Sequence, residues 1–215
     1  MPYRTPKAVQ EKKDAKRHHI LDAAAKVFAK RGYYNTKVRD ILVEAGISTG
    51  SFYFYFNNKE EVFQILYDEM INAYVSVLQE AVATMTDNAE HIAQSLIKAI
   101  TLSLQAFQKN MELARIMLIG SVGINPQFEK KRTADYQKIS LVFEEIFREL
   151  LQKRAIRVPD PKVAAILFTG SIFSLITNWL QEDNPRELVA YTQPLIVYNL
   201  QALGIQCDNL DLEYI

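Results

Sequence analysis

The chain has 215 residues, of which 49 % are hydrophobic and 23 % charged, with only seven Gly and seven Pro, a composition that excludes extensive disorder and suffices for a large core. Cys207 is the single cysteine, which excludes an internal disulfide framework and a multi-cysteine metal site and fits a reducing cytoplasm. The 25 basic and 25 acidic residues balance overall, but residues 1–59 hold 12 Lys/Arg against 5 Asp/Glu, so we expect only this end to approach a polyphosphate.

The first residues of the chain contain two Pro, several charges and no periodic apolar pattern. We therefore expect a flexible arm over residues 1–12, and the lack of an apolar core segment argues against a secretory signal. The first helix is predicted over residues 13–31, because apolar residues recur on one side from Ile20 to Phe28. Gly32 is expected to end it.

A second, short helix is predicted to follow Thr36, which occupies an N-cap position, and to end at Gly46. Between these two residues, apolar side chains recur at i, i+3, i+4 and i+7 from Val38 to Ala45. This spacing places them on one helical face.

A third helix is predicted to begin at Thr49, with Ser48 placed to accept a backbone N–H at its start. Phe52 is expected to face inward, and Thr49, Gly50 and Tyr53 outward. Two short helices joined by a Gly-containing turn form a helix-turn-helix. When the second helix offers its N-terminal turn to a partner, this is the geometry that enters a DNA major groove.

The run GISTGSFYFYFNNKEEVF, from Gly46 to Phe63, carries the most specific pattern in the chain. It resembles the signature of TetR-family transcriptional regulators, in which a Gly-hydrophobic-Ser turn leads into a short helix, an aromatic cluster and a Lys followed by Glu. The upstream runs ILDAAAKVFAKRGYYNT and TKVRDIL are similar to that family's first two helices. The resemblance covers about residues 16–66, and beyond them it rests on helix number and length alone.

Side-chain type divides the candidate DNA contacts into two groups. Thr49, Gly50 and Tyr53 are placed to meet base edges, because Thr can hydrogen-bond or touch a thymine methyl and Gly lets the helix come close. The others suit phosphates, and Arg39 could also reach a guanine. The full set of candidates is Thr36, Lys37, Arg39, Thr49, Gly50, Ser51, Tyr53, Tyr55 and Lys59.

The family resemblance supports part of this set residue by residue. It implies operator contacts by Arg39, Thr49, Gly50, Tyr53, Tyr55 and Lys59. The family frequently has Lys where this chain has Thr49 and Leu where it has Phe52, so the base preference stays open and the packing differs. A packed hydrophobic hinge is the competing interpretation of the aromatic run, and we accept it for Phe52 and Phe56.

Helical periodicity continues toward the C-terminus and is interrupted at residues typical of helix ends. A long helix that starts at Lys59 should link the basic end to the rest of the chain, where its movement could carry a signal. Further helices are predicted over about residues 88–109, 111–121, 126–154, 161–181 and 185–203.

The last two predicted helices are apolar around much of their circumference, and such a helix needs two partners. Residues 163–180 carry no charge, but small and polar residues interrupt the run, so a buried helix is favoured over a membrane span. We expect one side to pack on the core and the other on a second copy of the chain, with Gly170, Ser171 and Ser174 allowing close approach. A buried helix pair within a monomer is the alternative.

The C-terminal part offers bulky aromatic side chains and a few polar groups, which suit a small-molecule cavity. The family resemblance implies small, often hydrophobic effectors bound between helices in this region. The candidate ligand contacts are Tyr74, Phe107, Arg115, Phe143, Asn178 and Trp179. For any single aromatic residue on a helical stripe, core filling is the competing interpretation.

An enzyme is not expected. The chain has three His, of which His18 and His19 lie in the basic end and His91 is isolated. No metalloprotease, nucleophile-elbow, phosphate-loop or dinucleotide motif occurs, and Cys207 has no His nearby in the sequence. We therefore expect neither a cofactor nor a metal.

Together these patterns predict an all-α protein of about nine helices. Its expected parts are the arm, a helix-turn-helix DNA-binding domain over residues 13–58, and an effector-binding and dimerisation domain over residues 59–215. The predicted function is a cytoplasmic homodimeric repressor, released from a palindromic operator by a small, mainly hydrophobic effector. The alternatives are an activator of the same fold, and a helical binding or assembly protein that uses its basic end on an anionic surface.

Overall fold

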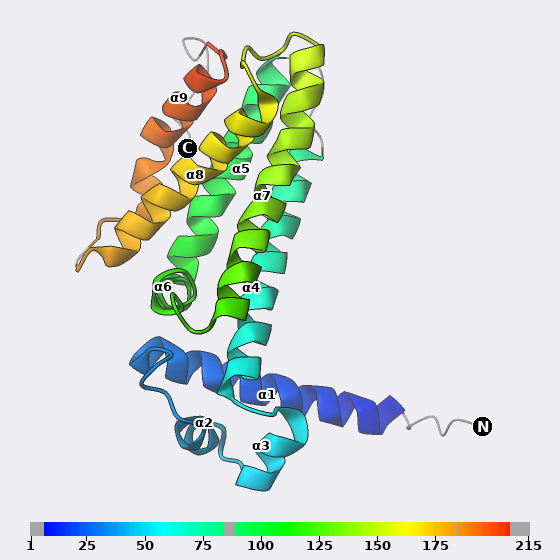
Figure 1. Ribbon diagram of the computed structural model, residues 1–215, viewed down its shortest axis with the longest axis vertical. Helices are drawn as coiled ribbons and strands as arrows, with labels where there is room; N and C mark the ends of the chain where they lie inside the picture. Colours follow the sequence, from blue (N-terminus) through cyan, green and yellow to red (C-terminus); the bar gives the residue numbers. More distant parts are fainter. Residues whose placement is uncertain (1–6, 84–88, 184, 207–215) are drawn as a thin grey trace.

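The computed structural model describes residues 7–83, 89–183 and 185–206, and these form helices and connecting turns without a strand (Figure 1). The all-α prediction is therefore confirmed. The helices are α1 (Lys7–Arg31), α2 (Val38–Ala45), α3 (Thr49–Tyr55), α4 (Lys59–Val82), α5 (Ala89–Lys109), α6 (Met111–Arg115), α7 (Pro126–Gln152), α8 (Pro161–Gln181) and α9 (Thr192–Ala202), with a π-helical turn at Ile116–Gly120 and a 3₁₀ turn at Leu188–Tyr191.

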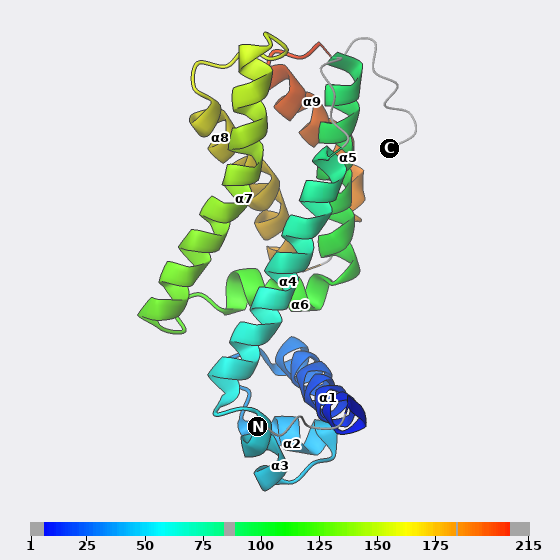
Figure 2. The same cartoon turned by 90° about the vertical axis from the view of Figure 1, so that its right-hand side faces the viewer.

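The helices lie in two groups joined by one long helix. Helices α1 to α3 lie together at one end of the molecule, and we call them the head (Figure 1). Helices α5 to α9 form the other end, and α4 runs from the head into this group (Figure 2). We call α4 to α9 the body.

Two helix starts differ from the sequence prediction. Helix α1 begins at Lys7, so residues 7–12 are helical and not part of a flexible arm, while residues 1–6 lie outside the described residues. An exposed helix needs good helix formers more than an apolar stripe, and this stretch supplies Ala, Gln, Glu and Lys. The last helix starts late, because Leu188–Tyr191 form a 3₁₀ turn before α9.

The predicted interruptions of the helical pattern before α7 and α8 are helix N-caps. The side chain of Asn125 accepts a hydrogen bond from the Phe128 backbone N–H at 2.8 Å, and Pro126 takes the first helical position of α7. The same arrangement recurs at α8, where the Asp160 carboxylate accepts from the Lys162 N–H at 2.8 Å. Pro at the first helical position loses no helical hydrogen bond, so the dipeptides Asn125-Pro126 and Asp160-Pro161 both favour a helix start.

A continuous chain of aromatic rings holds the head on the body. Phe63 of α4 packs edge-on against Phe28 and Tyr33 of the head, with ring centroids 5.3 and 4.8 Å apart. The Phe63 ring also packs against Phe128 of α7, with centroids 5.7 Å apart. These rings are buried, so they join the two groups through apolar burial as well as ring geometry.

A hydrogen bond from the head also reaches the loop before α7. The Tyr34 hydroxyl donates to the backbone carbonyl of Val122, in the loop before α7, at 2.9 Å.

Helix α8 is long and apolar enough to meet the length and composition of a membrane span, and 44 % of its most apolar window is buried. Its inner side packs on α7, α5, α6 and α9. The core helix of a folded body meets the same two criteria, and the contacts of α8 are those of a core helix.

Candidate DNA interface and effector cavity

The third helix presents its N-terminal turn to the outside. Ser48 is the N-cap, and its hydroxyl accepts a hydrogen bond from the Ser51 N–H at 3.2 Å. Phe52 is fully buried, as expected, whereas Thr49, Gly50 and Tyr53 are exposed, Tyr53 by 54 %. Helix α3 is thus anchored by one ring while a polar and aromatic face stays free.

Gly50 has open space around it. A Cβ built at this position would meet nothing within 4 Å, so packing inside the protein does not require a glycine there. The close approach of a binding partner to the axis of α3 is another reason for a glycine at this position.

The start of α2 departs from the prediction in one residue. Lys37, not Thr36, is the N-cap, and its backbone N–H donates to the Asp40 carboxylate at 2.9 Å. The Thr36 side chain is buried, and its hydroxyl donates to the Gly32 carbonyl at 2.7 Å. The prediction that Thr36 caps α2 is therefore wrong, and its buried hydroxyl is already bonded within the head.

The remaining candidate DNA contacts of the head differ in how exposed their side chains are. Lys37 and Arg39 are exposed, and Ser51 and Tyr55 are half-buried. Arg39, Thr49 and Tyr53 also line one open groove between α2 and α3, so the fold brings together residues from both helices.

Lys59 has a structural role that the sequence did not reveal. Its ammonium group donates to the backbone carbonyls of Tyr33 at 2.9 Å and Thr36 at 2.8 Å, and lies 4.4 Å from the centre of the Tyr33 ring. These bonds fix the start of α4 to the loop between α1 and α2. Only one of its three N–H donors remains for a phosphate.

Sequence reasoning missed Phe54. It lies on α3 beside Tyr53 and is 66 % exposed, with the Lys13 ammonium of α1 5.5 Å from its ring centre. Five consecutive aromatic residues in a short helix cannot all face inward, so the run could have indicated that a second residue besides Tyr53 faces outward. Which one does so depends on where α1 crosses α3.

A cavity of about 350 Å³ lies between α1, α4, α5 and α6, at the junction of the head and the body. Its wall is mainly apolar, and its volume is at the lower end of the range for small-molecule sites. The lining residues of α4 to α6 include Met70, Ala73, Tyr74, Val77, Phe107 and Leu113. Helix α1 supplies Asp22 and Ala25, so a molecule in this cavity would touch the head and the body together.

Tyr74 is the buried polar group of this cavity. Its hydroxyl lies 3.0 Å from the Ser103 hydroxyl, which itself donates to the Ala99 carbonyl at 2.6 Å. Because the Ser103 proton is already used, Tyr74 is the donor of the pair. Burial raises the pKa of the Tyr74 phenol, so this donor stays protonated.

Only two of the six ligand-contact candidates, Tyr74 and Phe107, line this cavity. Phe143 is fully buried against the Phe168 ring at 4.6 Å, and the Trp179 indole N–H donates to the Arg186 carbonyl at 2.7 Å. Both are core residues of the body.

The other two candidates also lie apart from the cavity. Asn178 is exposed on α8, and its amide donates to the Ser174 carbonyl of the same helix at 2.8 Å. Arg115 is half-buried in α6, with no hydrogen-bond partner for its Nε in the structure.

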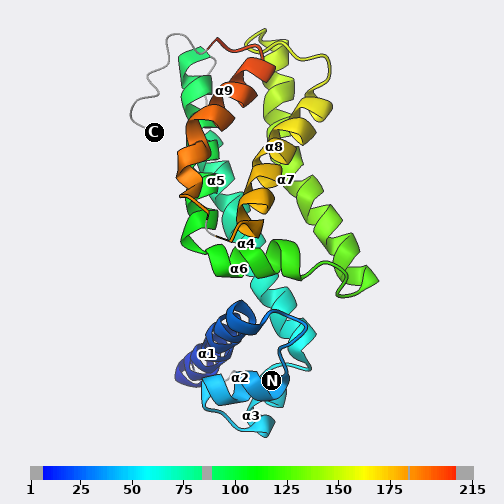
Figure 3. The same cartoon turned by 90° about the vertical axis from the view of Figure 1, so that its left-hand side faces the viewer.

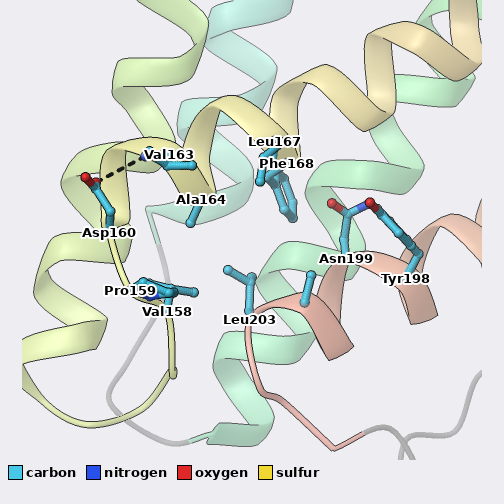
Figure 4. A pocket seen from close by; sticks show the side chains of 11 residues that line it. Val158, Pro159, Asp160, Val163, Ala164, Leu167, Phe168, Tyr198, Asn199 and Leu203 are labelled. Atoms are coloured by element: carbon cyan, nitrogen blue, oxygen red, sulfur yellow. Dashed lines mark hydrogen bonds between the residues drawn. The ribbon is translucent and has the colours of Figure 1, made fainter.

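A second hollow, also of about 350 Å³, lies on the outside of the body between the start of α8 and the end of α9 (Figure 4). Leu167 and Phe168 project into it from α8, opposite Leu203, which follows α9 (Figure 4). Of the exposed apolar residues here, Val163, Leu167 and Tyr198 line the hollow, and Ile166 of α8 lies beside them in the sequence. Together these four residues form an apolar surface, which we call the α8–α9 face.

The described residues contain no group of three or more His, Cys, Asp or Glu side chains that could hold a metal ion.

Comparisons with known proteins agree with this geometry. The family model for bacterial regulatory proteins, tetR family, matches residues 20–66, which span the C-terminal half of α1, all of α2 and α3, and the start of α4. The fatty acid metabolism regulator protein of Bacillus subtilis is 25 % identical over 187 residues, covering 86 % of this chain and 94 % of that protein.

Solved structures share the fold over nearly the full length. The fatty acid degradation regulator FadR of Bacillus halodurans superposes with a TM-score of 0.76 at 24 % identity, covering 89 % of this chain and 97 % of that one. FadR of Bacillus subtilis in complex with stearoyl-CoA also gives 0.76, at 23 % identity, covering 86 % and 98 %.

Proposed function

Since the chain belongs to the TetR family of bacterial transcriptional regulators, we propose that it is a cytoplasmic homodimeric repressor, released from a palindromic operator by a small, mainly apolar effector. The observation that carries the proposal is the capped helix α3, which buries Phe52 and exposes Thr49, Gly50 and Tyr53. We assign DNA binding to the residues before Lys59, and effector binding and dimerisation to residues 59–215.

In this proposal α3 enters the major groove and its exposed face reads base edges. Thr49 and Tyr53 supply hydrogen-bonding and apolar contacts, and Gly50 permits the close approach. Phosphate contacts by Lys37, Arg39 and the hydroxyls of the head fix the register, because such contacts position a protein without reading sequence. The last N–H of Lys59 is available for the same purpose.

We assign the dimer contact to the α8–α9 face. A two-fold dimer then places two copies of α3 in successive major grooves, so the operator is a palindrome with half-sites about 34–36 Å apart or somewhat more. Exposed apolar surface of this kind is typical of a protein interface.

The test of the DNA proposal is a selection of bound sequences from a random duplex library at two salt concentrations, with the wild type and Tyr53→Ala. We expect the wild type to enrich a palindrome. Tyr53→Ala should bind that palindrome about 10- to 100-fold more weakly, which corresponds to the 1–3 kcal/mol of a base-reading side chain. Affinity is measured by titrating labelled duplex.

Tyr53→Phe serves as the control, because it keeps the ring and removes only the hydroxyl. Salt-sensitive retention of DNA with no enriched sequence would contradict the proposal, because the head would then bind phosphate alone. That outcome favours the anionic-surface alternative. A reporter promoter carrying the enriched palindrome then separates repression from activation, since a repressor lowers its output.

We further assign the effector site to the cavity at the head–body junction and the effector to the fatty-acyl class. The relative from Bacillus subtilis is named as a regulator of fatty acid metabolism, which supports this class. The mainly apolar wall suits an acyl chain. The adjoining groove shares Ala25, Asn110 and Leu113 with the cavity and carries Lys26 and Lys109 beside Glu112, and we assign an anionic headgroup to the two lysines.

Filling the cavity should act on the head because α1 forms part of its wall. An effector changes DNA binding only if it prefers one position of α1 over another. A molecule bound between α1 and α4 contacts both helices. Its contacts therefore change when α1 moves relative to α4, and this gives it a preference for one position of α1.

Ala73→Phe is expected to block the effector response while leaving DNA binding intact. Ala73 is exposed at the cavity wall, so a larger ring there occupies the cavity at little cost to folding. Release of labelled operator duplex by stearoyl-CoA should need at least about tenfold more ligand than for the wild type, as expected for loss of roughly 1.4 kcal/mol of binding.

Ala134→Phe is the matched control, because Ala134 is exposed on α7 outside the cavity. Coenzyme A alone should not release the duplex. Triclosan serves as an apolar ligand without an acyl chain. Release of the duplex by triclosan but not by stearoyl-CoA would contradict the fatty-acyl assignment. An unchanged response in Ala73→Phe would contradict the location of the site.

A further inference from the structure

The N-terminal half of α1 is a basic surface that lies outside α2 and α3, the two helices of the helix-turn-helix. Residues 7–19 hold five Lys/Arg against two Asp/Glu. The family model begins at residue 20, so this stretch lies outside the matched region. It is nevertheless helical and continuous with the buried part of α1. At 1.5 Å per residue it extends the helix by roughly 20 Å.

Contacts with α3 show which side of this stretch faces the recognition helix. The Lys13 ammonium lies 5.5 Å from the Phe54 ring centre, and the Arg17 guanidinium 5.4 Å from that of Phe56. These two cations are four residues apart and therefore share one helical face, with Lys16 beside them. Lys13 and Lys16 are exposed, so their charges are available to a partner on that side.

The direction of α1 sets where such a partner would lie. In Figure 1 the N-terminal end of α1 projects past α4, to the side opposite α8 and α9. In Figure 2 the same end points toward the viewer, with α8 and α9 behind. In Figure 3 α8 and α9 are in front. A dimer formed through the α8–α9 face therefore directs this end away from its two-fold axis.

We propose that the N-terminal half of α1 binds backbone phosphates of the DNA that flanks each half-site on its outer side. The inference rests on the proposed function and extends it, because the protein then contacts more DNA than α3 can read. Lys12, Lys13 and Lys16 are the cations we assign to this contact. Being exposed point charges on flexible side chains, they suit phosphates and give no base preference.

The experiment compares two duplexes that carry the same enriched palindrome. The short duplex ends at the outer edge of each half-site, and the long duplex continues with unrelated sequence for about one helical turn on each side. Wild type should bind the long duplex at least about tenfold more tightly, because added phosphate contacts release counterions.

The Lys12→Gln/Lys13→Gln/Lys16→Gln variant should bind both duplexes with similar affinity. Gln is a good helix former, and the three positions are exposed, so the fold is expected to survive. On the long duplex, the slope of log affinity against log salt should fall by up to about 5, since a dimer loses six cations at roughly 0.9 each. The selected sequence should not change.

Lys98→Gln/Lys138→Gln/Lys153→Gln is the matched control, with the same charge change on the exposed surface of the body. Its affinity for the long duplex should equal that of the wild type. Equal binding of the two duplexes by the wild type would overturn the inference, as would an equal loss in the control variant. If the proposed function itself is wrong, the selection from the random duplex library will enrich no palindrome, and this result precedes the comparison of the two duplexes.

Anionic vesicles of phosphatidylglycerol provide the last comparison, at the same salt concentrations. Retention of the wild type on these vesicles, lost in the triple variant and accompanied by no dependence on duplex length, would reassign the surface to a membrane and overturn the DNA assignment.

Discussion

Replacing Leu167 with Arg is expected to convert the dimer into a folded monomer. Leu167 is 64 % exposed and lines the same hollow as Val163 and Tyr198 on the α8–α9 face. In a two-fold interface the substitution occurs twice, and each unpaired buried charge costs about 3–5 kcal/mol. The dimer dissociation constant should therefore rise on the order of 10⁴-fold or more.

Sedimentation velocity at micromolar concentration measures this change directly. Leu141→Arg is the matched control, because Leu141 is 51 % exposed on α7, outside the α8–α9 face. The control should keep the mass of the wild type. A dimeric Leu167→Arg variant, or equal dissociation of both variants, would place the interface elsewhere.

Loss of the dimer should also reduce operator affinity. In the proposed dimer, two heads joined in one molecule bind the palindrome, so the second half-site would be filled at a high effective concentration. A monomer keeps the same contacts to one half-site and loses this advantage. Titration of Leu167→Arg with a single half-site duplex should therefore match the wild type more closely than titration with the full palindrome.

Phe63→Ala is expected to lower the free energy of unfolding by about 3–5 kcal/mol, the usual cost of truncating a buried Phe. Phe63 is 1 % exposed and packs against Phe28, Tyr33 and Phe128. The cavity left behind would open at the point where the head meets the body.

Urea unfolding followed by far-ultraviolet circular dichroism gives the measurement. Gln64→Ala is the control, since Gln64 is the exposed neighbour on the same helix and should change stability by less than about 0.5 kcal/mol. A loss below about 1 kcal/mol in Phe63→Ala would contradict its role as the central ring of the junction.

The order and type of the helices could be predicted from the sequence because their signals are local. Apolar spacing, glycines such as Gly46, and the Asn125-Pro126 and Asp160-Pro161 dipeptides act within a few residues. The start of α1, residues 7–12, was missed because an exposed helix has no apolar stripe. Its helix-forming composition was the remaining signal.

The site was harder to predict, because its geometry depends on contacts between distant residues. Thr36 and Lys59 looked like phosphate contacts by residue type, yet their side chains bond to backbone carbonyls of the loop between α1 and α2. Periodicity indicates that Phe143 and Trp179 face inward. It does not show whether neighbouring helices fill the space, as they do here, or leave a cavity, as beside Tyr74.

The position of the cavity between α1 and the body has a consequence for the regulator in a cell. Coupling between two binding sites is reciprocal, so an effector that weakens operator binding by a given factor is itself bound more weakly, by that factor, when the protein is on DNA. Regulator molecules free of the operator would therefore take up effector first. Raising the number of copies of the protein should thus shift derepression to a higher effector concentration, with no change in any affinity.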